Sequence, residues 1–215
     1  MNTFETGESL ANDGLPRSRL YHLAPIGVVT PLIESLTSYI GRLAWAYRIS
    51  PRAFVTEVIV PNLGGSHYLQ LSLAHVHSFC RYESMRINGI GEAAADWAET
   101  LASLTMRTDL RLLTLYTWAK GLPNLRLLRT TPAWCPECYA EWREAKVPVY
   151  QPLLWMLRVM TVCPQHERQL EEHCPYCLKL QSTIASNKVE VGCCTQCGAW
   201  LGILPAIGVR LEIDE

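Results

Sequence analysis

The chain has 215 residues, of which 49% are hydrophobic and 18% are charged, so it can bury a sizeable core in one or two small domains. Its formal net charge is −1 and its sequence pI is about 6.6, which excludes the strong overall basicity of proteins that bind nucleic acid unaided. The longest apolar stretch, 152–163, contains Arg158 and is shorter than the roughly 20 residues of a membrane-spanning helix.

The N-terminal segment predicts a disordered tail over residues 1–19. Its acids, Glu5, Glu8 and Asp13, interrupt any apolar run of the kind found in a secretory signal. Residues 20–130 then predict a helical domain.

This helical region begins with a predicted helix-turn-helix. Between residues 33 and 47, apolar side chains such as Leu36, Ile40 and Leu43 recur at three- and four-residue spacing, which places them on one helix face. Ser50 followed by Pro51 is typical of an N-cap and a first helical turn. We therefore expect a second helix up to about residue 60, ended by Pro61.

A second pair of helices is predicted further along the chain. Residues 92–104 are rich in alanine and carry apolar side chains in helical phase, and Asp109 is placed to cap a helix that reaches Lys120. Residues 122–131 predict a linker. The pattern of residues 62–88 is weaker and indicates only a short helix around residues 70–79.

Eight of the nine cysteines lie between residues 135 and 197, in a pattern typical of metal binding. Four motifs each place two ligands two residues apart, a spacing at which a tight turn directs both side chains to one ion. The predicted ligands of these motifs are Cys135 and Cys138, Cys163 and His166, Cys174 and Cys177, and Cys194 and Cys197.

Joining neighbouring motifs predicts two zinc sites, one with three cysteines and a histidine and one with four cysteines. Sixteen residues separate Cys177 from Cys194, a zinc-ribbon spacing. The spacing alone also permits a cross-braced pairing, and Cys193 and His173 stand beside predicted ligands. Thiol redox activity is the alternative, which the lack of a thioredoxin-like pattern disfavours. The two zinc modules are expected over 131–170 and 171–204, with a C-terminal tail over 205–215.

Both predicted zinc sites have four protein ligands, and this leaves no open position of the kind that a catalytic zinc keeps. The sequence also lacks a phosphate-binding loop, a nucleophile elbow and a zincin motif. A third metal site formed by His75, His77 and Cys80 lacks a fourth ligand within sequence reach. We therefore expect a protein without enzymatic activity.

The most basic stretch runs from residue 107 to residue 129 and has a single acid, Asp109. It is either a solvated face or a contact for phosphate groups. The candidate nucleic-acid contacts are Arg107, Arg111, Lys120, Arg126 and Arg129.

Three segments together resemble the TniQ family, whose larger relatives include TnsD. They are the Glu-Ser-Leu motif that opens at Glu34 and contains Arg42, the leucine-rich residues 101–115, and the cysteine-rich region from Trp134 to Cys197. The resemblance covers about residues 31–202. It implies a mainly α-helical fold, with a helix-turn-helix followed by tandem zinc modules.

The resemblance also implies a function in the bacterial cytoplasm, close to the nucleoid. Family members are target-selection proteins of transposons and link a target-recognition device to the AAA+ ATPase TnsC. Only 18 residues follow Cys197, which resembles the short TniQ proteins of CRISPR-associated transposons, so the expected partners include a CRISPR effector with its guide RNA. Target DNA would be contacted weakly or indirectly.

The predicted helix-turn-helix is the expected surface for a protein partner, because it has few charges around a large apolar face. The charged residues expected to contact a partner are Glu34, Arg42, Arg48 and Arg52. The alternative hypothesis is a sequence-specific DNA-binding regulator. Neither candidate recognition helix, 50–60 or 109–120, offers the several Arg, Asn or Gln side chains that such a protein directs at base edges.

Overall fold

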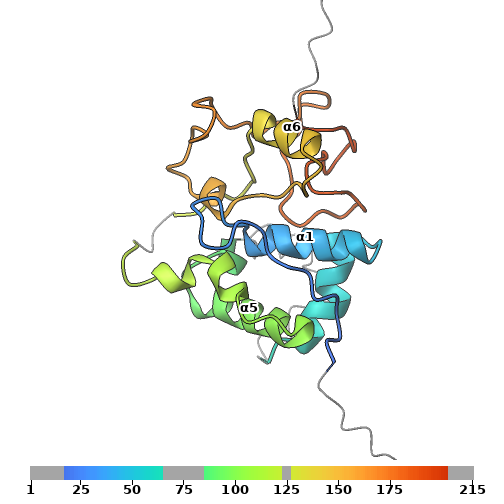
Figure 1. Ribbon diagram of the computed structural model, residues 1–215. Coiled ribbons are helices and arrows are strands. Elements are labelled where there is room, and N and C mark those ends of the chain that lie inside the picture. The colour runs from blue at the N-terminus through green and yellow to red at the C-terminus, as the bar shows by residue number, and fades with distance from the viewer. Residues whose placement is uncertain (1–16, 65–84, 123–126, 203–215) are drawn as a thin grey trace, which may run out of the picture.

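The computed structural model describes residues 17–64, 85–122 and 127–202, arranged as a helical part (17–122) and a cysteine-rich part (127–202). Figure 1 shows the cysteine-rich part above the helical part, with helix α1 (Leu36–Ala46) between it and helix α5 (Glu92–Thr105). The described residues contain isolated β-bridges and no extended sheet. The predicted class, mainly helical with metal-binding modules, is confirmed.

Helix α1 begins where the sequence places a hydroxyl at the N-cap. Ser35 accepts a hydrogen bond from the amide of Ser38, and the helix ends at Ala46 with Tyr47 as its C-cap. Its buried residues include Leu36, Ile40 and Leu43, as the periodicity predicts. A second helical segment starts at Pro51 after a short turn, so the order helix, turn, helix is the one predicted.

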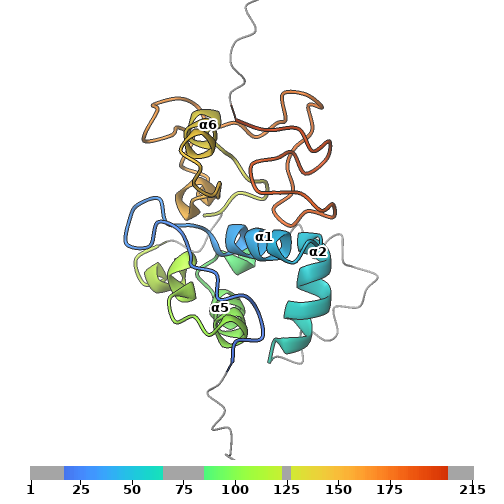
Figure 2. The same cartoon turned by 45° about the vertical axis from the view of Figure 1, so that its right-hand side comes forward.

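This second segment is irregular. It begins as α2 (Pro51–Ala53) with Ser50 as its cap, continues as the π-helix η1 (Phe54–Ile59), and ends as the 3-10 turn η2 (Val60–Asn62). The hydroxyl of Thr56 donates to the carbonyls of Arg52 and Ala53, and Pro61 cannot supply a backbone donor. Figure 2 shows α2 beside the C-terminal end of α1.

The predicted helix over residues 109–120 is wrong. Its place is taken by two 3-10 turns, η4 (Leu110–Leu113) and η5 (Leu115–Trp118). Thr114 between them has an extended backbone, and its hydroxyl accepts from the amide of Tyr116. Asp109 does not cap a helix because its carboxylate binds Arg107.

The apolar residues 153–160, which lie between the two motifs of the first metal site, also predict a helix from their sequence, and this prediction is wrong. Only η6 (Leu153–Met156) forms, because Leu157 pairs with Leu128 in a β-bridge and draws the chain into an extended course. Trp155 packs into the core as expected, whereas Val159 is 81% exposed. The short helix expected near residues 70–79 lies outside the described residues.

Among the described residues, three buried clusters form the core, and the first and third of them join the helical part to the cysteine-rich part. The first joins α1, η1 and α5 through residues such as Leu43, Phe54 and Trp97, and it includes Ile184 from the cysteine-rich part. The second surrounds the cysteines and contains Trp134, Tyr139 and Trp155. A third, smaller cluster joins Leu115 to Leu128, Leu153 and Met156.

Candidate metal centres

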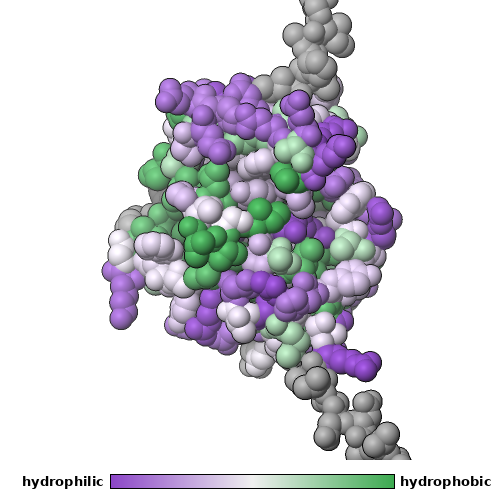
Figure 3. Space-filling view, viewed as in Figure 1, coloured by the Kyte–Doolittle hydropathy of each residue, from purple (hydrophilic) through white to green (hydrophobic). Residues whose placement is uncertain are grey.

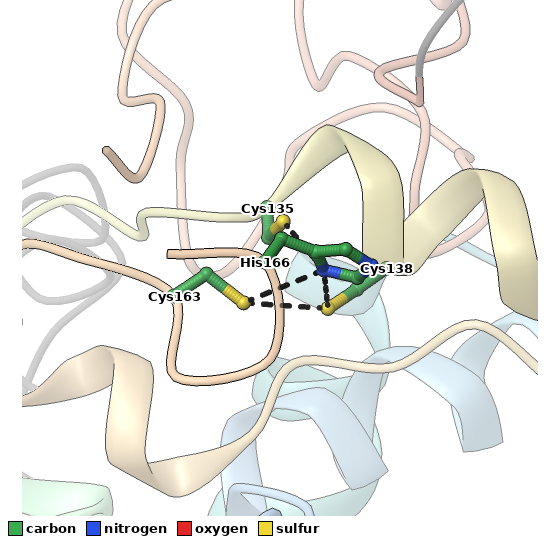
Figure 4. Close-up of side chains that lie close together, drawn as sticks. All are labelled: Cys135, Cys138, Cys163 and His166. Atoms are coloured by element: carbon green, nitrogen blue, oxygen red, sulfur yellow. Dashed lines mark hydrogen bonds between the residues drawn. The ribbon is translucent and has the colours of Figure 1, made fainter. Parts of the chain in front are cut away.

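The first group of metal ligands is built by helix α6 (Pro136–Glu144) and the turn 163–166. Cys135 is the N-cap of α6 and Cys138 lies in its first turn, so both side chains leave the same end of the helix. His166 directs Nδ1 toward the three sulfur atoms, as Figure 4 shows, at 3.5, 3.3 and 3.7 Å from the Sγ atoms of Cys135, Cys138 and Cys163.

The second group is built by the two turns 174–177 and 194–197. The Sγ atoms of Cys174 and Cys197 are 3.8 Å apart, and those of Cys177 and Cys194 are 3.7 Å apart. In each group the four ligand atoms lie within 4.8 Å of one another. The structure therefore pairs neighbouring motifs in sequence and does not cross-brace them; Cys193 and His173 belong to neither group.

Three of the four motifs share one backbone geometry. In each, the amide of the first cysteine donates to a carbonyl five residues later, and the amide four residues later donates back to the cysteine carbonyl. The fourth residue after the cysteine then takes a left-handed conformation, with φ of 51° at Glu167, 60° at Leu178 and 77° at Gly198. The first motif differs because helix α6 replaces this turn.

The electrostatics of the first group favour a bound cation. A hydrogen bond from Cys138 lowers the pKa of Cys135 to about 5, and the same contact raises the pKa of Cys138. One thiol of the pair is therefore easy to ionise, and the second resists because a thiolate already lies beside it. A divalent cation removes this repulsion, which is why clustered thiols bind metal as thiolates.

Backbone amides support ionisation in the second group. Burial of Cys194 opposes its ionisation, but the amides of Cys197 and Gln196 outweigh burial and lower the pKa of Cys194 to about 6. Both amides lie within 3.5 Å of the Cys194 sulfur. The two groups differ in accessibility, because Cys135, Cys138 and Cys163 are fully buried while Cys197 is exposed.

The geometry fits zinc. Four ligands placed tetrahedrally at Zn–S distances of about 2.3 Å lie about 3.8 Å from one another. Several ligand pairs in the two groups lie 3.3–3.8 Å apart, close to that value, and every pair within a group lies within 4.8 Å. Three thiols with an imidazole, and four thiols, are also donor sets that zinc prefers in structural sites.

Glu141 lies beside the first metal group and was not among the predicted site residues. Its carboxylate lies 2.9 Å from Nε2 of His166 and raises the pKa of that imidazole to about 9. A carboxylate in this position fixes the orientation of a metal-binding histidine and leaves Nδ1 for the metal. Its spacing could have indicated this position, because Glu141 follows Cys138 by three residues and so lies on the same face of α6.

Most of the residues predicted to contact nucleic acid form ion pairs with acidic residues of the same chain. Arg107 is paired with Asp109, and the exposed Arg111 with Glu99. Arg129 is 9% exposed and binds Glu172 and the carbonyl of Met160. Lys120 is exposed. Arg126 lies outside the described residues, as do His75, His77 and Cys80.

The residues expected to contact a partner are divided between the interior and the surface. Glu34 has no exposed surface, so it supports the fold and offers nothing to a partner in this conformation. Arg42 is 12% exposed and forms an ion pair with Glu34. Arg52 donates its backbone amide to Ala185. Arg48 is exposed and lies over the ring of Trp45.

Comparison with known proteins decides the family. The sequence profile of the TniQ family matches residues 25–170, more than half of the chain. The chain belongs to the TniQ family. The matched range contains all four ligands of the first metal group, whereas the second group begins at Cys174, beyond its end.

Membership of the TniQ family places this chain among transposition-associated target-selection proteins. No curated protein sequence gives a significant match. Among the described residues, no helix is both long and apolar enough to cross a membrane.

Proposed function

We propose that this TniQ protein is a non-enzymatic adaptor that links a target-recognition complex to a TnsC-type AAA+ ATPase. The family match carries the proposal, because TniQ proteins act in target selection. The complex that it would serve is an RNA-guided CRISPR effector. The two metal groups would each hold one structural zinc ion.

The metal groups support a structural and not a catalytic function. Each provides four protein ligands, so zinc bound there would keep no open position for water or a substrate. Zinc would supply the folding energy that this small region of turns otherwise lacks. The first group lies within the cluster of Trp134, Tyr139 and Trp155, so metal and aromatic core would stabilise each other.

An exposed apolar face provides a surface for a protein partner. Figure 3 shows hydrophobic side chains gathered on the face where the loop 26–33 meets the segment 157–162. Val29 is 95% exposed and Val159 is 81% exposed. Val29 also has φ of 64°, a strained conformation for a β-branched residue, and such strain is often retained at functional surfaces.

The alternative, a sequence-specific DNA-binding regulator, has less support. The predicted recognition helix at 109–120 is a pair of 3-10 turns. The segment 51–62 is irregular, and its first turn is covered by Ala185 and Ser186 of the cysteine-rich part. A recognition helix needs an exposed N-terminal face to reach base edges in the major groove.

The proposal is tested with the full chain, the ATPase of the same element assembled on DNA with ATP, and a co-sedimentation assay. Wild-type protein should co-sediment with the DNA-bound ATPase. A Val29→Asp/Val159→Asp variant should bind at least ten-fold more weakly, because burying each carboxylate without a partner is unfavourable. Tyr176→Asp/Leu178→Asp, which changes exposed apolar residues at the second metal group, is the matched control.

Two results would reject the proposal. If wild-type protein does not co-sediment with the DNA-bound ATPase in any nucleotide state, the ATPase is not a partner. A complex with one duplex DNA sequence tighter than about 10 nM at physiological salt, in the range of specific regulators, would favour the alternative.

A further inference from the structure

The loop between the two turns of the second metal group reaches back onto the helical part. Ile184 in this loop is 3% exposed and belongs to the cluster formed by α1, η1 and α5. The carbonyl of Ala185 accepts the amide of Arg52 at 3.0 Å. A Cβ atom at Gly41 of α1 would lie 3.2 Å from the side chain of Val191, so helix and loop are in close contact.

The same loop is anchored inside the turn 194–197. The amide of Thr195 donates to the side-chain oxygen of Gln181 at 2.8 Å, and its hydroxyl accepts the amide of Ser182 at 3.0 Å. Its carbonyl accepts from the side chain of Asn187 at 3.2 Å. Since Thr195 stands between Cys194 and Cys197, the position of the loop depends on the geometry of the metal ligands.

The second group is also the more accessible of the two to an oxidant. Cys197 is exposed and Cys177 is partly exposed, whereas all three cysteines of the first group are buried. Oxidation of a cysteine requires access for the oxidant, and a resolving thiol nearby directs the product to a disulfide. Cys174 supplies that thiol, with its Sγ 3.8 Å from that of Cys197.

We propose that Cys197 is a peroxide-sensitive oxidation site, resolved by Cys174, and that its oxidation detaches the loop 181–191 from α1 and α2. The Cys197 thiolate attacks a peroxide oxygen, the O–O bond breaks, and a sulfenic acid forms with hydroxide, which takes a proton to become water. The Cys174 thiolate then attacks the sulfenic sulfur. The S–S bond forms, hydroxide leaves and is protonated, and the two electrons lost by the thiolates have reduced the peroxide.

The disulfide leaves the second group with two thiolates, Cys177 and Cys194, which are too few to complete a tetrahedral zinc site. The turn 194–197 then loses the geometry that positions Thr195. Ile184 leaves the helical core, and the surface of α1 and α2 beneath the loop becomes exposed. The first group stays intact, because its three cysteines are buried.

The test starts from full-length protein with its zinc content measured, so that a chain without zinc is recognised before oxidation. Hydrogen peroxide is added stepwise, released zinc is measured with a colorimetric chelator, and disulfides are mapped by mass spectrometry. One zinc per chain should be released at a dose that retains the other, with a disulfide between Cys174 and Cys197. Deuterium exchange should become at least ten-fold faster at the amide of Arg52 and at residues 182–188.

Three outcomes would overturn the proposal. Simultaneous release of both zinc ions, or a first disulfide within Cys135, Cys138 and Cys163, would refute the selective site. A disulfide to Cys193 would refute Cys174 as the resolving thiol. Zinc release without faster exchange at the Arg52 amide would refute the coupling to the loop.

A variant that keeps all eight metal ligands tests the coupling without oxidation. Thr195→Val removes the hydroxyl that accepts from Ser182. We expect this variant to retain two zinc ions and to show faster exchange at residues 182–188 and at the Arg52 amide. Gln196→Ala, an exposed position in the same turn, should behave as wild type. Wild-type exchange in Thr195→Val would show that the turn does not hold the loop.

Discussion

Glu34 and Arg42 form an ion pair beneath the surface where the helical and cysteine-rich parts meet. The Oε2 atom of Glu34 accepts from Nη1 of Arg42 at 2.6 Å, and its Oε1 atom accepts from the hydroxyl of Ser38 at 2.9 Å. The Ser38 hydroxyl in turn accepts the amide of Gln151 at 3.0 Å. One buried carboxylate therefore joins the start of α1 to the chain that leads away from α6.

This network predicts a large loss of stability when Glu34 is removed. Glu34→Ala leaves Arg42 and Ser38 without their acceptor, and breaking a buried pair costs about 3–5 kcal/mol. Chemical denaturation of the zinc-loaded protein measures the change. Glu57→Ala, an exposed acid in η1, should alter stability by no more than about 0.5 kcal/mol. Equal stability of the two variants would contradict the structural role of Glu34.

The pKa of Glu34 also predicts that the stability of the protein depends on pH. Burial raises its pKa from 4.5 to about 6, with the charge of Arg42 opposing the rise. A carboxyl group with a raised pKa in the folded state loses stability as pH increases through that value. Relative to Glu34→Gln, wild-type protein should therefore become less stable by about 1 kcal/mol between pH 5 and pH 8. Parallel stability curves for the two proteins would show that the pKa is not raised.

The metal groups predict two zinc ions per chain, measured by elemental analysis of protein purified without chelators. Cys135→Ser and Cys174→Ser should each lose one ion and destabilise the cysteine-rich part, because metal binding supplies about 10 kcal/mol or more to small zinc modules. A single zinc in wild-type protein, or unchanged melting of both variants, would contradict this prediction.

Glu141 should affect zinc affinity without being a ligand. Glu141→Gln removes the charge that orients His166, and such changes weaken metal binding by about 10- to 100-fold. Competition with a chromophoric chelator measures the affinity of the first site. Glu144→Gln, exposed at the end of the same helix, is the control. If both variants bind zinc as wild type does, the contact with His166 does not tune the site.

The basic residues of the stretch 107–129 differ in burial, so reversing their charges should have different effects. Arg129→Glu should destabilise the fold, since it places a carboxylate beside Glu172 and the carbonyl of Met160. Lys120→Glu should leave folding and zinc content unchanged, because Lys120 is exposed. If this stretch contacts nucleic acid, Lys120→Glu should also reduce the salt dependence of RNA or DNA binding, as measured by fluorescence anisotropy. An unchanged salt dependence would indicate a solvated face.

The local patterns of the sequence were sufficient for α1 and α5, and they favoured the pairing of neighbouring ligand motifs without excluding a cross-braced one. In these elements, periodicity, caps and ligand spacing all act within a few residues. The helix predicted around Thr114 failed because the backbone there is extended, which apolar spacing does not reveal. The helix predicted after Leu153 failed because Leu157 pairs with the distant Leu128.

Contacts between distant segments account for the rest of what the sequence did not predict. The charges of Glu34 and Arg129 indicated exposed contacts, but both side chains are buried beside partners that are remote or unpredictable from spacing. Nothing in the sequence around Ile184 indicates that it enters the core of α1 and α5. A pattern that repeats along the chain can place a residue on a face, but it cannot specify which distant segment covers that face.

Bridging of two partners is the central claim, and a reconstitution assay tests it most directly. A tagged target-recognition complex bound to its DNA target is immobilised, and retention of the TnsC-type ATPase is measured with and without the full chain. The amount of retained ATPase should rise as wild-type chain is added and should be lower with the Val29→Asp/Val159→Asp variant. Retention that is equally strong without the chain, or absent at every concentration of it, would contradict the adaptor function.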